Sequence, residues 1–164
     1  MKLSVQHTFD CTPEEFWEMY WDEAYDEMLT ADSDVVREIV SEREEDGIIV
    51  RRLRFTPNKE LPRAFAKLLG TNKLVYEQEN RWNRTASTMT WEVIPTVLPG
   101  KLTARGTFSV QPHGSGCIQT VDGDISVNVR FIGGQIEKGV VEEVRKTYER
   151  TGRLTRDFLA RRKG

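Results

Sequence analysis

The stretch RFIGGQIEKGVVEEV, residues 130–144, decides how this sequence is interpreted. It joins an extended segment to the longest helical pattern and contains Gly133, Gly134 and Gly139. Each glycine inside a helix costs about 0.5–1 kcal/mol relative to alanine, so three in the first turns need a reason. We interpret the first two as the turn into the helix, and Gly139 as a point of close approach to a sheet or a gap that shapes a cavity. An anion site at the helix N-terminus is a third alternative, although the spacing matches no phosphate-binding motif.

Downstream of these glycines, apolar residues recur every four positions and charged residues occupy the opposite side. The pattern predicts an amphipathic helix over residues 132–162, with an irregularity at Gly152. A helix of this length needs a broad apolar surface to cover its inner side.

The N-terminal part predicts one strand followed by two short helices. Residues 3–10 alternate loosely and are typical of a strand. Thr12 and Glu15 have the spacing of a capping box at the start of a helix. A second short helix is expected over residues 23–29, after a kink near Asp22.

Six further strands are predicted between these helices and the last one. Residues 34–55 form a hairpin around Asp46-Gly47, a pair that favours tight turns. A short helix within residues 57–72 carries Phe65, Leu68 and Leu69 on one face and ends at Gly70. The remaining strands are expected at residues 73–82, 87–95, 101–112 and 117–130, the last with a bulge at Gly123. Arginines and glutamates on the outward face of the middle strands are expected to form cross-strand ion pairs.

This order predicts an α+β fold in which a curved, seven-stranded antiparallel sheet lies around the long C-terminal helix. The sequence resembles the helix-grip fold of the START and Bet v 1-like (SRPBCC) superfamily, and within it the bacterial family DUF2505. The segments FDCTPEEFWEMYWDEAYDEML, LPRAFAKLLG and VNVRFIGGQIEKGVVEEVRK carry the resemblance, which covers almost the whole chain. The segment IGGQIEK is also similar to PRELI-type lipid carriers. The family pattern has a proline before Ile-Gly-Gly, where this chain has Arg130 and Phe131.

The resemblance implies a cavity between the sheet and the helix, used in the superfamily for lipids, sterols or polyketides. Strand alternation places aromatic and polar side chains together on the inner face of the sheet. A sealed core rarely accepts unpaired polar groups, so we expect either a ligand cavity there or a sheet edge beyond the core near Asn80 and Trp82. The candidate lining residues are Tyr20, Leu53, Tyr76, Gln78, Asn80, Trp82, Ser87, Met89, Trp91, Phe108, Ile136, Gly139, Val140 and Val144. Arg51 is a further candidate for orienting the polar end of a ligand.

No catalytic residue, metal site or cofactor is predicted. The two histidines, His7 and His113, show no catalytic pairing, and the resemblance brings no catalytic residues. Cys11 and Cys117 have no zinc spacing and are expected to be buried, reduced thiols.

Composition excludes several classes of protein. The chain has 24 Lys and Arg against 26 Asp and Glu, a net charge of −2, and lacks the basic stripe of a nucleic-acid-binding protein. No segment predicts a signal peptide or a stable membrane insertion. One cytoplasmic domain over residues 1–164 is expected.

We therefore expect a protein that binds or carries a small hydrophobic or amphipathic ligand. Two alternatives stay open: a protein-interaction module with a filled core, and a cyclase or hydrolase acting on a polyketide-like substrate. The aromatic residues of segment 14–29 could also guard a cavity mouth or meet a protein partner or membrane, although the acids there disfavour an anionic membrane. Neither the ligand nor any protein partner is specified by the sequence.

Overall fold

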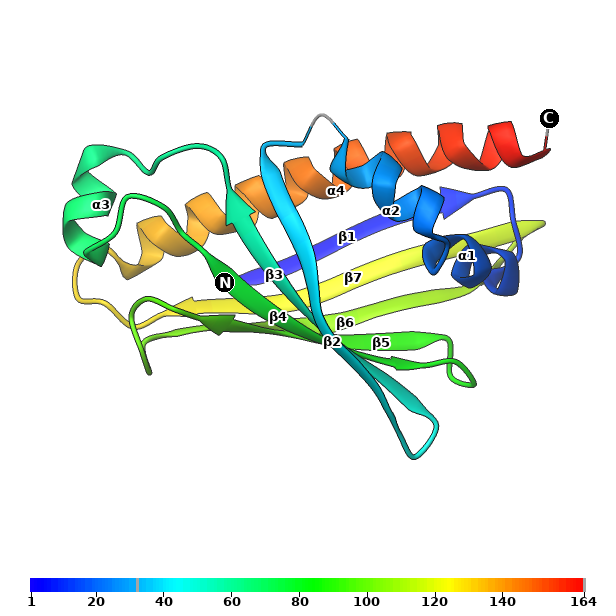
Figure 1. The fold of residues 1–164 in the computed structure, drawn as a ribbon, viewed down its shortest axis with the longest axis horizontal. Helices are drawn as coiled ribbons and strands as arrows, with labels where there is room; N and C mark the ends of the chain where they lie inside the picture. Colours follow the sequence, from blue (N-terminus) through cyan, green and yellow to red (C-terminus); the bar gives the residue numbers. More distant parts are fainter. Residues whose placement is uncertain (32, 164) are drawn as a thin grey trace.

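The computed structural model describes residues 1–31 and 33–163 and has the predicted α+β order (Figure 1). The elements are β1 (Lys2–Phe9), α1 (Pro13–Tyr20), α2 (Glu23–Thr30), β2 (Val35–Glu45), β3 (Ile48–Pro57), α3 (Arg63–Leu69), β4 (Tyr76–Asn83), β5 (Thr88–Pro95), β6 (Leu102–His113), β7 (Gly116–Val127) and α4 (Gly133–Lys163). The last strand ends three residues earlier than predicted, because the chain turns toward α4 at Phe131, whose φ is +71°.

All seven strands belong to one antiparallel sheet with the order β1-β7-β6-β5-β4-β3-β2, which confirms the predicted sheet. The hairpin between β2 and β3 closes at the predicted dipeptide, since Glu45 pairs with Ile48. Asp46 and Gly47 have φ values of +52° and +81°, as a two-residue type I′ turn requires. The predicted cross-strand ion pairs are also present, with Glu77 3.5 Å from Arg52 and 3.8 Å from Arg54.

A pair of facing glycines, and not a bulge, is found at the position of Gly123. The register of β7 runs unbroken against both β1 and β6, so the bulge prediction was wrong. Gly106 and Gly123 face each other across β6 and β7 beneath the indole of Trp91. A Cβ built at Gly123 would lie 2.5 Å from Cζ2 of Trp91, so the glycine makes room for the ring. The irregularity of the sheet lies instead in β2, between Ile39 and Ser41.

Helix α4 is continuous through Gly152, so the predicted irregularity there was wrong. A Cβ at Gly152 would lie 3.0 Å from the imidazole of His7, so this glycine lets the helix approach β1. Gly133 makes a similar approach, since a Cβ there would overlap the carbonyl oxygen of Val127. Gly139, by contrast, is exposed and a Cβ there would meet nothing within 4 Å. The interpretation of Gly139 as a point of close approach was therefore wrong, and so was the idea that its missing side chain opens a gap toward the sheet.

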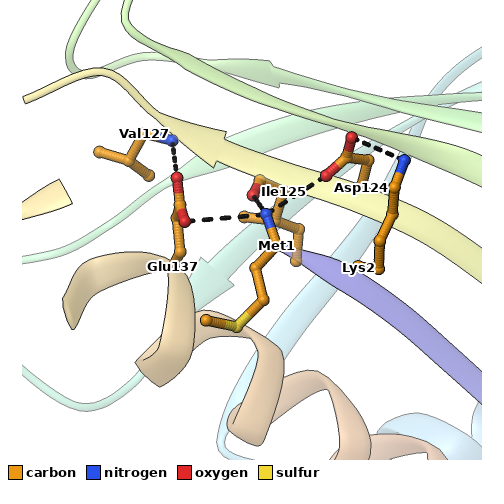
Figure 2. A network of polar contacts seen from close by, with 6 residues as sticks. All are labelled: Met1, Lys2, Asp124, Ile125, Val127 and Glu137. Atoms are coloured by element: carbon orange, nitrogen blue, oxygen red, sulfur yellow. Dashed lines mark hydrogen bonds and ion pairs between the residues drawn. The ribbon is translucent and has the colours of Figure 1, made fainter. Parts of the chain in front are cut away.

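The first turn of α4 is fastened to the edge of the sheet by a polar network (Figure 2). The carboxylate of Glu137 accepts a hydrogen bond from the backbone N–H of Val127 at 2.9 Å and lies 3.7 Å from the amino group of Met1. The same amino group lies 3.3 Å from Asp124 of β7, which also pairs with Lys2. These contacts fix the position at which the helix begins.

The two short helices pack their aromatic rings into the interior. The predicted capping box is present, because Thr12 and Glu15 exchange side-chain and backbone hydrogen bonds. Phe16, Trp17 and Tyr25 are buried. Trp17 and Tyr25 therefore belong to the core, whereas Tyr20 and Trp21 are half-buried, and a role of these two rings at a cavity mouth stays a prediction. Within residues 1–31 and 33–163, no helix combines the length and the hydropathy needed to span a bilayer.

Candidate functional site

The candidate site is the inner face of strands β3, β4 and β5, the side of the sheet that faces α4. Helix α4 packs mainly against β7, β1 and α2, so it approaches one edge of the sheet more closely than the middle strands. Figure 1 shows the helix running along one side of the curved sheet with α2 beside it, and α1 near the ends of the strands. Side chains therefore span the distance between the middle strands and the helix.

Most of the predicted lining residues share this inner face. Strand register aligns Leu53 with Gln78, Asn80 with Trp91, and Met89 with Phe108. Asn80 and Trp82 are buried, at 4% and 7% exposure, so the alternative that they lie at an edge beyond the core was wrong. The half-buried members are Tyr20, Tyr76, Gln78, Ile136, Val140 and Val144. Gly139 is the exception, because it is exposed on α4.

Ser87 has a structural role at the β4–β5 turn. Its hydroxyl accepts a hydrogen bond from Nε1 of Trp17 at 2.7 Å and donates one to the carbonyl oxygen of Val110 at 2.5 Å. The first contact joins α1 to the turn, and the second joins β6 to it. Both hydrogen-bonding functions of the hydroxyl are therefore used within the protein, where they hold α1 and β6 in place.

Four tyrosines form a cluster in the interior: Tyr20, Tyr25, Tyr76 and Tyr148, which we call the tyrosine cluster. Burial raises the pKa of Tyr148, and the nearby hydroxyls of the other three raise it further. The four residues come from α1, α2, β4 and α4, so the cluster links the helices to the middle of the sheet. Tyr25 shares a hydrogen bond of 2.9 Å with Thr155 of α4. At neutral pH these phenols are protonated, because the pKa of each is raised above its ordinary value of 10 mainly by burial.

Two arginines face the same interior, Arg37 from the edge strand β2 and Arg51 from its neighbour β3. Arg51 stacks over the ring of Trp21, 4.1 Å from its centroid, and pairs with Glu42 at 2.8 Å. Arg37 pairs with Asp26 of α2, and burial lowers its pKa below the ordinary value of 12.5. Both guanidinium groups also act to lower the pKa of Tyr20, against the larger effect of burial. The polar side of the interior is therefore rich in hydrogen-bond donors.

Amides and indoles add to this donor set. The side chain of Gln78 donates to Oδ1 of Asn80 at 2.8 Å. Within the described residues, the buried Nε1 atoms of Trp82 and Trp21 have no hydrogen-bond partner. A buried donor without a partner costs about 1–3 kcal/mol, so an acceptor from a ligand or from water would stabilise this region.

The two best-formed hollows in the described part of the chain lie elsewhere. The larger, of about 780 Å³, is open and lies on the outer face of the sheet, where its lining includes Ser4, Glu92, Arg105, Thr107 and Asp122. The smaller, of about 250 Å³, lies where β5 and β6 diverge beyond Glu92 and Arg105. Neither hollow lies between the middle strands and α4, where large side chains occupy the space.

Residues suited to acid–base or metal chemistry are sparse in the described residues. No group of three or more His, Cys, Asp or Glu side chains with metal-binding geometry is found there. His7 lies on the inner face of β1, and burial followed by the charge of Arg156 holds its pKa below the ordinary 6.5. Cys11 and Cys117 are buried, free thiols as predicted, with their sulfur atoms 3.8 Å apart.

Sequence reasoning missed Arg37, Tyr25 and Tyr148 as members of the site. Tyr148 was assigned to the apolar side of α4 by its spacing, and that spacing was the signal that it faces the sheet. Arg37 gave no such signal, because it lies in an edge strand with charges on both faces. Its inward position depends on Asp26 of α2, a contact between two elements.

Comparisons with known proteins agree with this architecture. The model of the family described as "Protein of unknown function (DUF2505)" matches residues 4–159. The ZhuI aromatase/cyclase from Streptomyces sp. R1128 is similar in structure, with a TM-score of 0.67 and 10% identity over 100% of this chain and 96% of that one. A START superfamily protein from Mycobacterium smegmatis gives a TM-score of 0.62 with 16% identity, over 96% and 98% of the two chains. The protein TTHA0849 from Thermus thermophilus gives 0.65 with 16% identity, over 96% and 95%. No curated protein sequence matches the chain.

Proposed function

The chain belongs to the DUF2505 family and has the helix-grip fold of the START superfamily, and from this premise we propose that it binds a small apolar or amphipathic ligand between strands β3–β5 and helix α4. One observation carries the proposal: the inner face of β3–β5 combines apolar side chains with protonated phenols, amides and indole N–H groups. Helix α4 packs more closely on β1 and β7 than on these middle strands. The ligand class of the superfamily supports it by analogy.

Affinity would come mainly from burial of apolar surface, at about 25 cal/mol per Å² removed from water. The ligand would contact half-buried residues on both sides, among them Tyr76 of β4 and Val140 and Val144 of α4. Because the interior is occupied by side chains, entry of a ligand would require some of these rings to move. Tyr76 of β4 and Tyr148 of α4 are candidates for this movement, because both rings are only half-buried.

The polar end of such a ligand would be a hydrogen-bond acceptor. The phenols, the amide of Gln78, the guanidinium of Arg51 and the indole of Trp82 all donate hydrogen bonds. A carbonyl, ester or carboxylate fits this set better than an ammonium group, because Asp26 and Glu42 are already paired with Arg37 and Arg51. We therefore place the polar end of the ligand near Tyr20 and Asn80.

The test is a titration with an apolar fluorescent probe, a naphthalene sulfonate, against matched variants. Val144→Trp fills the inner side of α4 and should weaken probe binding at least about tenfold, since the added ring occupies the ligand space. Gly139→Leu adds a side chain on the exposed side of the same helix and should leave the affinity unchanged. Equal affinity in all three folded proteins would contradict the proposed site.

A second candidate function is a protein-interaction module with a filled core. It is favoured by the dense aromatic interior, in which Trp17 lies 5.3 Å from Trp82 and 5.6 Å from Phe108 between ring centroids. The position of both best-formed hollows away from the space between the middle strands and α4 also favours it. This function predicts that no variant of the inner face changes probe binding, because the wild type binds none.

A cyclase-type activity is the weaker alternative. One structural neighbour is named an aromatase/cyclase, but identity of 10% supports only a common fold. His7 is the inward group with the chemistry of a base, yet it is covered by α4 at Gly152. We keep the cytoplasm as the proposed location, because both cysteines are free thiols.

A further inference from the structure

One end of the molecule carries a local excess of positive charge next to exposed apolar side chains. It comprises residues 57–73 with α3, residues 96–101 between β5 and β6, and residues 128–138 at the start of α4; we call it the basic end. These segments hold seven Lys and Arg against two Glu, whereas the whole chain has a net charge of −2. Figure 1 shows α3 and the start of α4 at the same end of the long axis.

Hydrogen bonds join two segments of the basic end to each other and to the chain just before β4. The backbone N–H of Asn128 donates to the carbonyl oxygen of Lys101 at 2.7 Å. The hydroxyl of Thr96 donates to the carbonyl oxygen of Val75, just before β4. Residues 96–101 and 128–138 are therefore fixed to each other and to the sheet, and α3 lies at the same end of the molecule.

Most of the cations at this end are not used in ion pairs. Lys59 pairs with Asp34 at 2.9 Å. Within residues 1–31 and 33–163, the others take part in no ion pair: Arg63, Lys67, Lys73, Lys101, Arg130 and Lys138. Their charges are therefore available to an anionic partner.

The same surface exposes large apolar side chains. Phe131 is 89% exposed, and Leu68 and Phe65 of α3 are 44% and 39% exposed. Phe65 and Leu68 belong to the apolar face of α3 that the sequence predicted, and the structure leaves both exposed. Phe131 also has a positive φ, a strained conformation for a bulky residue, and the guanidinium of Arg130 stands 5.0 Å over its ring.

Exposed rings among unpaired cations match the surface of an anionic bilayer. Apolar side chains enter the boundary between headgroups and acyl chains, while Lys and Arg contact the anionic headgroups. We propose that the basic end docks the protein on a membrane surface that contains anionic phospholipid, with Phe131 entering the interface. A second copy of this chain fits poorly, because pairing two basic ends brings like charges together. The inference goes beyond the proposed function and does not depend on an internal ligand.

Vesicle co-sedimentation tests this docking. The wild type should bind phosphatidylcholine vesicles that contain about 30% phosphatidylserine, bind pure phosphatidylcholine far more weakly, and dissociate as salt is raised, because each basic residue near the surface contributes about fivefold. Phe131→Asn should reduce the partition coefficient at least about fivefold, through loss of the buried ring. Asparagine tolerates positive φ, so this variant should fold.

A charge reversal and its control complete the test. The double variant Arg63→Glu with Lys67→Glu should reduce binding at least about tenfold through four units of charge. Arg84→Glu changes an exposed arginine at the β4–β5 turn, away from the basic end, and should bind like the wild type. The proposal is overturned if the wild type does not distinguish the two vesicles, or if the double variant binds as well as Arg84→Glu. It is also overturned if the basic end binds duplex DNA or a second copy of the chain in preference to vesicles.

Discussion

The indole of Trp91 stands where a side chain at Gly123 would have to be: a Cβ built on that glycine would lie 2.5 Å from Cζ2 of the ring. Gly106 faces Gly123 across the strand pair, and a Cβ there would meet the same ring atom at 2.7 Å. The two glycines thus make room for one large side chain on the inner face of the sheet. That side chain is one of the predicted lining residues of the candidate site.

Gly123→Ala should lower the free energy of unfolding by about 1–3 kcal/mol, because the added methyl group overpacks the indole of Trp91. In a Trp91→Phe background the same substitution should cost markedly less, since the smaller ring leaves space. Gly106→Ala is the control, because its Cβ would also overlap the carbonyl oxygen of Asp122, and that clash remains after the ring is reduced. Urea denaturation of the double-mutant cycle measures the coupling; additive costs at Gly123 would contradict the packing described here.

The glycines of α4 should respond to alanine in opposite directions. Gly139→Ala should raise the free energy of unfolding by about 0.5–1 kcal/mol, because alanine favours the helix and the added Cβ meets no neighbour. Gly152→Ala should be destabilising, since its Cβ would press on the imidazole of His7 at 3.0 Å. Thermal denaturation of both variants checks the pair. A stabilised Gly152→Ala protein would show that α4 does not pack on β1 in this way.

Glu137 should matter more as a hydrogen-bond acceptor than as a charge. Glu137→Ala removes the acceptor for the backbone N–H of Val127 and should cost about 1–3 kcal/mol of stability. Glu137→Gln keeps an acceptor oxygen and loses only a partly exposed ion pair with the amino group of Met1, so it should cost about 1 kcal/mol or less. Chemical denaturation distinguishes the two. Equal losses would assign the stabilisation to the charge instead.

His7 should make stability depend on pH in a defined direction. Burial and Arg156 hold its folded-state pKa below 6.5, so the unfolded chain takes up the proton first as the pH falls. The contribution of His7 is therefore complete above pH 6.5 and is lost as the pH falls through the folded-state pKa. Between about pH 7 and pH 5, the unfolding free energy of the wild type should fall more than that of His7→Gln. Parallel curves for the two proteins would remove His7 as the cause.

The sequence predicted those features that depend on neighbouring residues. The capping box at Thr12, the turn at Asp46-Gly47 and the left-handed helix end at Gly70 each follow from local backbone chemistry. Alternation along β4 also placed Tyr76, Gln78 and Asn80 correctly on the inner face.

The features that the sequence did not predict depend on contacts between distant segments. Gly123 was assigned to a bulge and Gly152 to a helix irregularity, because the partners that explain them, Trp91 and His7, are far away along the chain. The tyrosine cluster needs four elements in place before its members meet. Gly139 faces outward because of the position at which α4 begins. The contacts of Glu137 fix that position.

The central claim, a ligand held between the middle strands and α4, is tested most directly by native mass spectrometry of the protein isolated from its own host. The account predicts a bound apolar or amphipathic molecule in a ratio of one per chain, absent from the Val144→Trp variant and retained by Gly139→Leu. Protein that is free of any adduct in all three preparations, and that also takes up no added fatty acid or apolar probe, would contradict it.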